Sequence, residues 1–209
     1  MSRMLQKETK WPLQISLHTT NCMCIPILTW TDTMLDLEWG WANGTRPFPQ
    51  ELLEIESTAR QIGAYPHAHF PLVGNAVTHP HDATYMSGKA VPEMVKTDWA
   101  MRMIYEILRQ QYRGMDFKPY DKMVYDFGYP NCKIMNYWDD NYPVKVDNDA
   151  VKSILLNNGK KIMIIFASWS EKPVTVNVKL DSSLKVKNPS FQLKFNKFGA
   201  EIIEKEIIK

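Results

Sequence analysis

Apolar and polar positions alternate in short segments of the first third of the chain, and stretches with helical spacing separate these segments. Residues 13–21 (LQISLHTTN) and 33–41 (TMLDLEWGW) alternate with a period of two, as half-buried strands do. Residues 51–64 carry apolar side chains at helical spacing, residues 65–75 form a short extended segment, and residues 94–113 give the strongest helical stripe. The order strand, strand, helix, strand, helix predicts α/β layering.

The pattern changes near residue 130, where helical spacing gives way to β-strand runs. Residues 153–181 hold such runs, broken by the turn-forming stretches NNGK and SEKP. Val174, Val176 and Val178 alternate with polar residues, and the runs FQLKFNKFG and EIIEKEIIK continue the pattern. We therefore expect residues 131–209 to form a small antiparallel β-domain.

The strand predicted at residues 33–41 carries two carboxylates opposite a bulky apolar face. Asp36 and Glu38 share one face, whereas the other face carries Leu and Trp side chains, including Trp39 and Trp41. One interpretation is an amphipathic strand with a solvated acidic face. The other is a strand whose tip lines a polar pocket while its apolar face packs against helices.

Composition sets bounds on size, partners and compartment. The 209 residues suffice for one large domain or two small ones, and 44% hydrophobic with 23% charged residues is ordinary for a globular protein. A net charge of +2 gives no electrostatic reason to expect nucleic acid or a membrane surface as a partner. No apolar run reaches membrane-spanning length, and the first residues lack a signal core. Taken literally, these features indicate a cytoplasmic protein, but they are also expected if a natural N-terminal part is missing. The compartment therefore stays open, and a secreted parent protein would make it periplasmic or extracellular.

Aromatic, cysteine and histidine residues suggest candidate chemistry. Seven Trp and nine Tyr fit a sugar-binding cleft, among several explanations. The three cysteines lack metal-like spacing and predict free thiols. Two H-x-H pairs, His67 with His69 and His79 with His81, make a metal site conceivable. Because the pairs lie in Pro-rich segments with no acid between them, we expect histidines that contact a ligand or one another, with no metal and no cofactor.

Six stretches, in order along the chain, carry a resemblance to a known family. They are LHTTNCMCIPILTW, LDLEWGW, TARQIGAYP, WAMRMIYEIL, DFGYPNCKIMNYWDDNYPVKVDN and IIFASWSEKPVTVNVKLD. In this order they resemble the C-terminal part of a bacterial glycoside-hydrolase-like family that is similar to glycoside hydrolase family 123, and the resemblance extends over about residues 13–181. The run NYWDDNYPVKVDN, followed by a strand that contains ASW, is the most specific part.

The resemblance implies an α/β plus all-β fold. Residues 1–130 would be the C-terminal portion of a TIM-type (β/α)8 barrel, and residues 131–209 a small antiparallel β-sandwich that closes the chain. The N-terminal sandwich and the early barrel strands of such proteins have no counterpart here. Half a barrel leaves open sheet edges, so association through these edges is expected.

The resemblance also implies a carbohydrate as the partner and the ends of barrel strands as its site. His18 and Asn21 follow the first predicted strand, and Asp36 and Glu38 lie on the second, close to Trp39 and Trp41. The expected substrate-binding residues are His18, Asn21, Trp39, Trp41 and His67. Family 123 is similar to enzymes that use an adjacent Asp–Glu pair and the acetamido group of the substrate, and this chain contains no Asp–Glu dipeptide.

Three hypotheses about function follow. The first is a glycoside hydrolase in which Glu38 and Asp36 substitute as the two catalytic carboxyl groups, one as the acid and one kept ionised. The second is a non-catalytic carbohydrate-binding or structural remnant, in which these carboxylates hold sugar hydroxyls. The third is a metal-binding protein that uses the paired histidines.

Three tryptophans outside the predicted site, and one dense polar–aromatic run, have expected structural roles. Residues 137–142 (YWDDNY) suggest a junction that docks the β-sandwich onto the barrel, with Asp139 or Asp140 capping a turn. Trp99 is expected in the core on the helical stripe, and Trp169 in the core of the sandwich. Trp30 could stack on a sugar ring or be buried in the core.

Overall fold

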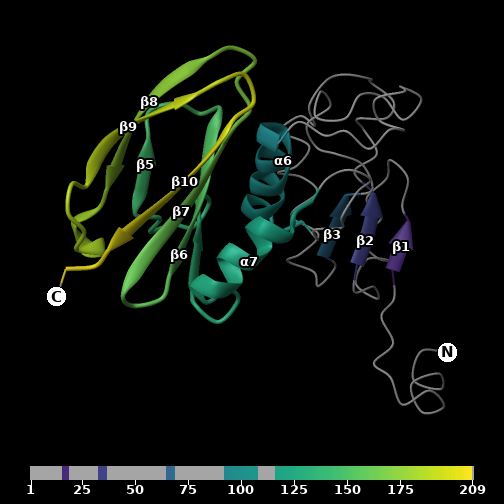
Figure 1. Ribbon diagram of the computed structural model, residues 1–209, viewed down its shortest axis with the longest axis horizontal. Coiled ribbons are helices and arrows are strands. Elements are labelled where there is room, and N and C mark those ends of the chain that lie inside the picture. Colours follow the sequence, from purple (N-terminus) through teal and green to yellow (C-terminus); the bar gives the residue numbers. More distant parts are fainter. Residues whose placement is uncertain (1–15, 19–32, 37–64, 69–91, 108–115, 209) are drawn as a thin grey trace.

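A computed structural model describes residues 16–18, 33–36, 65–68, 92–107 and 116–208 of the chain (Figure 1). Strands β1 (Ser16–His18), β2 (Thr33–Asp36) and β3 (Tyr65–Ala68) form a parallel sheet in the order β1-β2-β3. These strands fall within the three segments expected to be extended. The helix predicted at 51–64 lies outside the described residues.

Helix α6 (Pro92–Ile104) follows the parallel sheet and is buried almost all round. The predicted span of 94–113 is wrong at its C-terminal end, because the helix stops at Ile104 and Glu106 adopts a left-handed backbone with φ 51°. Trp99 is fully buried, as predicted. The sequence predicts burial of an apolar stripe only, whereas the structure also buries the charged residues Asp98 and Arg102.

The buried charges of α6 pair with each other one helical turn apart. Arg102 Nε donates to Asp98 Oδ1 over 2.6 Å, and both side chains are at most 1% exposed. The guanidinium also lies over the ring of Phe117, 5.6 Å from its centroid. A buried charge without such partners would cost several kcal/mol, about 3–5 kcal/mol when one member of a pair is removed.

Helix α7 (Lys118–Phe127) was not predicted, although the sequence contains its signals. Pro119 lies in its first turn, and Gly128 ends it with φ 124°, a conformation that favours glycine. Val124 and Phe127 provide its buried face. Asp121 links it to α6, because the Trp99 indole Nε1 donates to Asp121 Oδ1 over 3.0 Å.

The rest of the chain forms two antiparallel sheets, as predicted for a β-rich C-terminal domain. One sheet has the order β10-β7-β6-β4 and the other the order β5-β8-β9. The strands are β4 (Lys133–Asn136), β5 (Val144–Val146), β6 (Val151–Asn157), β7 (Lys161–Ser168), β8 (Val174–Leu180), β9 (Ser190–Phe195) and β10 (Ala200–Glu206), with a 3₁₀ helix η2 (Ser182–Leu184) between β8 and β9. The turns NNGK and SEKP lie between β6 and β7 and between β7 and β8, as predicted.

The four-stranded sheet is the shared wall of two hydrophobic cores. In β7, Ile164 and Phe166 pack toward the β5-β8-β9 sheet, whereas Met163 and Ile165 belong to the core that contains the helices. This two-sided burial explains why the sequence of β7, KIMIIFAS, is almost continuously apolar. Figure 1 shows the resulting layers, with the three-stranded parallel sheet beyond α6 and α7.

Candidate functional site

The first candidate site is the carboxyl edge of the parallel sheet. β1 ends at His18, β2 ends at Asp36, and β3 contains His67 one residue before its end. The register aligns His18 with Leu35, and Leu35 with His67, so the two histidines lie level on either side of the central strand. Asp36 is one residue further along, level with Ala68.

This register brings three of the predicted site residues to one edge of one sheet. A carboxylate accepts hydrogen bonds from sugar hydroxyls, and a neutral imidazole both donates and accepts. Asn21, Glu38, Trp39 and Trp41 lie outside the described residues, so their roles stay predictions. The same holds for His69, His79 and His81 and for the metal alternative that includes them.

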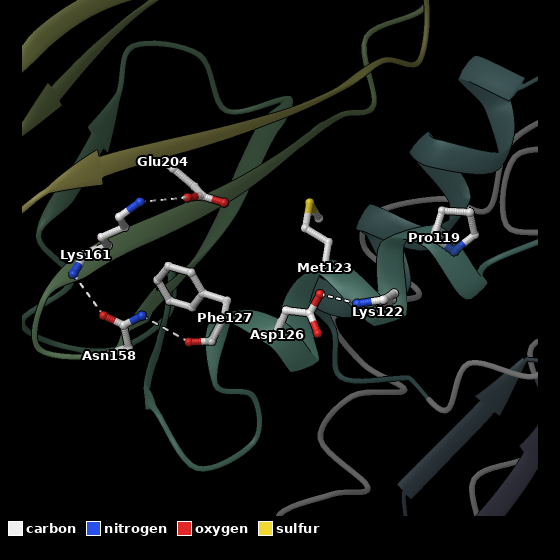
Figure 2. Close-up of a pocket in the computed structure, with 8 residues that line it drawn as sticks. All are labelled: Pro119, Lys122, Met123, Asp126, Phe127, Asn158, Lys161 and Glu204. Carbon is white, nitrogen blue, oxygen red and sulfur yellow. Dashed lines mark hydrogen bonds and ion pairs between the residues drawn. The ribbon is translucent and has the colours of Figure 1, made fainter.

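A second candidate is a groove of about 480 Å³ between α7 and the four-stranded sheet (Figure 2). It is lined by Pro119, Lys122, Met123, Asp126, Phe127, Asn158, Lys161 and Glu204. Figure 2 shows Lys122 and Asp126 on the α7 side, with Lys161 and Glu204 on the strand side.

The charges of this groove neutralise one another. Lys122 pairs with Asp126 along α7, and Lys161 lies 4.0 Å from Glu204 across β7 and β10. Asn158 donates to the carbonyl oxygen of Phe127 over 3.0 Å, which holds the β6–β7 turn against the end of α7. Both carboxylates are exposed and each is paired with a lysine, as in ordinary surface ion pairs. The groove is therefore a joint between helix and sheet.

The polar–aromatic run after β4 lies where the four-stranded sheet meets the end of α6, and its predicted role in docking a sandwich onto a barrel stays a prediction. The side chain of Asn136 donates to the carbonyl oxygen of Ile104 at the end of α6 over 2.7 Å. Asp139 Oδ2 accepts from the backbone N–H of Asn136 over 2.8 Å, so Asp139 stabilises the turn as predicted for Asp139 or Asp140. The Tyr137 hydroxyl donates to the Tyr105 hydroxyl over 3.0 Å.

Aromatic rings gather around Tyr105 at this junction. The Tyr105 ring centroid lies 6.0 Å from that of Tyr137, 5.9 Å from that of Trp138 and 5.6 Å from that of Trp169. Trp169 is buried as predicted, but it packs in the core that faces the helices. Lys152 Nζ lies 4.8 Å from the Tyr137 ring centroid. The sequence pattern did not identify Tyr105 or Lys152 as members of this cluster.

Cys132 and Tyr142 are further polar groups of the described residues. Cys132 is a free thiol, and burial raises its pKa, which disfavours the reactive thiolate. Burial also raises the pKa of Tyr142, whose hydroxyl is hydrogen-bonded to Ser153 over 2.8 Å. No cluster of three metal-ligating side chains occurs among the residues that the structure describes. Within the same residues, no helix has the length and apolarity needed to cross a membrane.

Comparison with known proteins shows what the antiparallel part of the chain is similar to. Residues 117–200 match the family model described as glycoside hydrolase 123, C-terminal domain. The match begins at the start of α7 and ends at the start of β10, and so covers most of both antiparallel sheets. The chain thus resembles the C-terminal part of a glycoside hydrolase 123-like protein, as its sequence motifs indicated. No curated protein matches the chain.

Proposed function

We propose that the chain is the C-terminal portion of a glycoside-hydrolase-like protein that acts on or binds a carbohydrate. The observation that carries this proposal is the match of residues 117–200 to the glycoside hydrolase 123 C-terminal domain. In the family that the sequence resembles, such a domain closes a carbohydrate-active barrel. The residues before it are then the region in which a sugar site is expected.

In this proposal, β1, β2 and β3 are neighbouring strands of a TIM-type barrel. Their parallel pairing in sequential order supports this assignment, as does the helix α6 that follows β3. In such barrels, the residues that bind the substrate lie at the carboxyl ends of the strands. His18, Asp36 and His67 lie at these ends, which supports their role in binding sugar hydroxyls.

The catalytic form of the proposal uses Asp36 and Glu38 together. Residues two apart on one strand face are separated by about 7 Å, which is compatible with a pair of carboxyl groups acting on one glycosidic bond. One carboxyl would serve as the acid with a raised pKa, and the other would stay ionised. Asn21 would donate a hydrogen bond, and Trp39 and Trp41 would stack on the sugar.

The second candidate function is carbohydrate binding without turnover. The observation that favours it is the absence of an Asp–Glu dipeptide from all 209 residues. Asp36 and Glu38 would then accept hydrogen bonds from sugar hydroxyls without taking part in bond cleavage.

Turnover of aryl β-glycosides tests both candidates. The full chain is incubated with a panel that includes the N-acetylgalactosaminide, beside Glu38→Gln and Asp36→Asn. Glu206→Gln, an exposed residue on β10, is the matched control for removal of a carboxylate. If Glu38 is the acid, we expect a loss of about 100-fold or more in kcat for Glu38→Gln and no change for the control.

A chain that is folded but inactive on every substrate would contradict the catalytic form. Binding of the same sugars, weakened by Asp36→Asn and unchanged by Glu206→Gln, would then select the binding function. Absence of both turnover and binding would overturn the proposal.

A further inference from the structure

Trp138 stands out because its indole is exposed although it belongs to a packed aromatic cluster. Among the described residues it is one of three large hydrophobic side chains classed as exposed, at 42%, with Tyr125 and Ile208. One side of its ring contacts the cluster, with centroid distances of 4.9 Å to Tyr137 and 5.9 Å to Tyr105. The remaining surface faces outward.

The backbone and neighbours hold this indole in place before any ligand arrives. Residues 136–141, which we call the Trp138 turn, are anchored at Asn136 to the end of α6 and closed by Asp139. The bond between the Tyr137 and Tyr105 hydroxyls fixes the ring beside Trp138. A fixed aromatic surface loses little conformational entropy on binding, which favours its use as a ligand contact.

Polar side chains surround the exposed indole. Asp139, Asp140 and Asn141 follow Trp138 directly and are all exposed. Within the part of the chain that is described, the side chains of Asp140 and Asn141 make no hydrogen bond or ion pair. Their oxygens and amide are free to bind hydroxyl groups.

We propose that the Trp138 turn is a secondary binding site for one pyranose ring of a neutral glycan. The indole would stack on the C–H face of the sugar, and Asp140 and Asn141 would bind its hydroxyls. A single ring with a polar rim has the dimensions of one sugar and is small for a protein interface. The adjacent carboxylates Asp139 and Asp140 disfavour uronic or sulfated sugars through like-charge repulsion.

The Trp138 turn is distinct from the carboxyl edge of the parallel sheet. Figure 1 shows α6 beginning at the end of the molecule toward which β1, β2 and β3 point, and the turn binds the opposite end of α6 at Ile104. The inference rests on the proposed function for its choice of a carbohydrate. Its role would be to hold a longer glycan chain at a second point.

Calorimetric titration of the full chain with neutral oligosaccharides tests this site. The probes are cellotetraose, triacetylchitotriose and β-1,4-galactotriose, with trigalacturonate as the anionic comparison. We expect Trp138→Ala to weaken binding of at least one neutral probe about tenfold or more. Trp138→Tyr should retain part of the affinity, and trigalacturonate should bind more weakly than the neutral probes. Tyr125→Ala, which removes another exposed aromatic ring, is the matched control and should leave affinity unchanged.

Variants of the first site separate the two proposals. If Asp36→Asn and Glu38→Gln leave binding intact while Trp138→Ala abolishes it, the secondary site stands and the proposed site at the strand ends fails. If Trp138→Ala binds every probe as the wild type does, or if the wild type binds none, the secondary site is overturned. Indole ¹⁵N–¹H spectra check the same point, because the Trp138 signal, assigned with Trp138→Tyr, should shift on titration.

Discussion

The two faces of the β10-β7-β6-β4 sheet are buried in different ways. The face toward β5, β8 and β9 is covered mainly by aliphatic and Phe side chains, such as Ile164, Phe166 and Leu193. The face toward the helices meets a core that also contains buried polar groups, including the Asp98–Arg102 pair and Asn136. One face is therefore held mainly by apolar packing, and the other by packing combined with specific hydrogen bonds.

This difference shows which core mainly stabilises the fold and which core fixes the orientation of the packed elements. Apolar packing is non-directional and scales with buried area. Hydrogen bonds contribute less net free energy, but leaving a buried partner unsatisfied is costly, so they fix one arrangement. The helix-facing core therefore sets how α6 and the Trp138 turn are oriented, whereas the sandwich core supplies stability to the domain.

The largest expected effect comes from truncating the sandwich core. Phe166 is fully buried between the sheets, so Phe166→Ala should lower the free energy of unfolding by about 3–5 kcal/mol. Urea unfolding followed by circular dichroism measures this loss. Thr175→Ala, on the exposed face of β8, should change stability by less than about 0.5 kcal/mol. Equal losses for the two variants would refute the assignment of the core.

A smaller effect is expected from the hydrogen bond that joins the sheet to α6. Asn136→Ala leaves the carbonyl oxygen of Ile104 without this partner and should cost about 1–3 kcal/mol in the same assay. Asn141→Ala removes the same side chain from an exposed position of the turn and is the control. An Asn136→Ala variant as stable as the control would show that apolar packing alone orients the helix.

The smallest effect concerns a polar contact beside the sandwich core and depends on pH. Burial raises the pKa of Tyr142 above the value of about 10 for a free tyrosine. Above pH 10 the unfolded chain therefore loses this proton first, and the stabilisation present at lower pH declines as the pH rises. The slope contributed by one such tyrosine reaches at most about 1.4 kcal/mol per pH unit.

Urea unfolding between pH 8 and 11 tests this dependence. Tyr142→Phe should reduce the alkaline loss of stability, and Tyr125→Phe, at an exposed position, should leave it unchanged. An alkaline slope that is the same in all three proteins would exclude Tyr142 as its source.

Sequence patterns were sufficient for the β-domain because its signals are local. Turn residues at NNGK and SEKP, and the period-two alternation around Val176, define strands without knowledge of the tertiary structure. Helix α7 was missed because aromatic and charged residues mask its short apolar face, although Pro119 and Gly128 mark its two ends. The C-terminal end of α6 was misjudged because apolar residues at helical spacing continue past Ile104, where the structure has the left-handed backbone of Glu106.

The candidate sites were predictable only as far as local sequence patterns determine them. The ends of strands follow from local pattern, so the sequence predicts that His18 and Asp36 lie near strand ends. Their alignment with His67 depends on strand register, which the sequence alone does not specify. The cluster joins Tyr105 to aromatic residues that lie 32 or more positions further along the chain, and no periodicity connects them.

The two-sided burial of β7 has a consequence for how the described layers can come apart. Removing the helices would expose the side chains of Met163 and Ile165, and removing the second sheet would expose those of Ile164 and Phe166. Either separation would present a continuous apolar surface to water. We therefore expect the helical layer and the two sheets to unfold together as one cooperative unit.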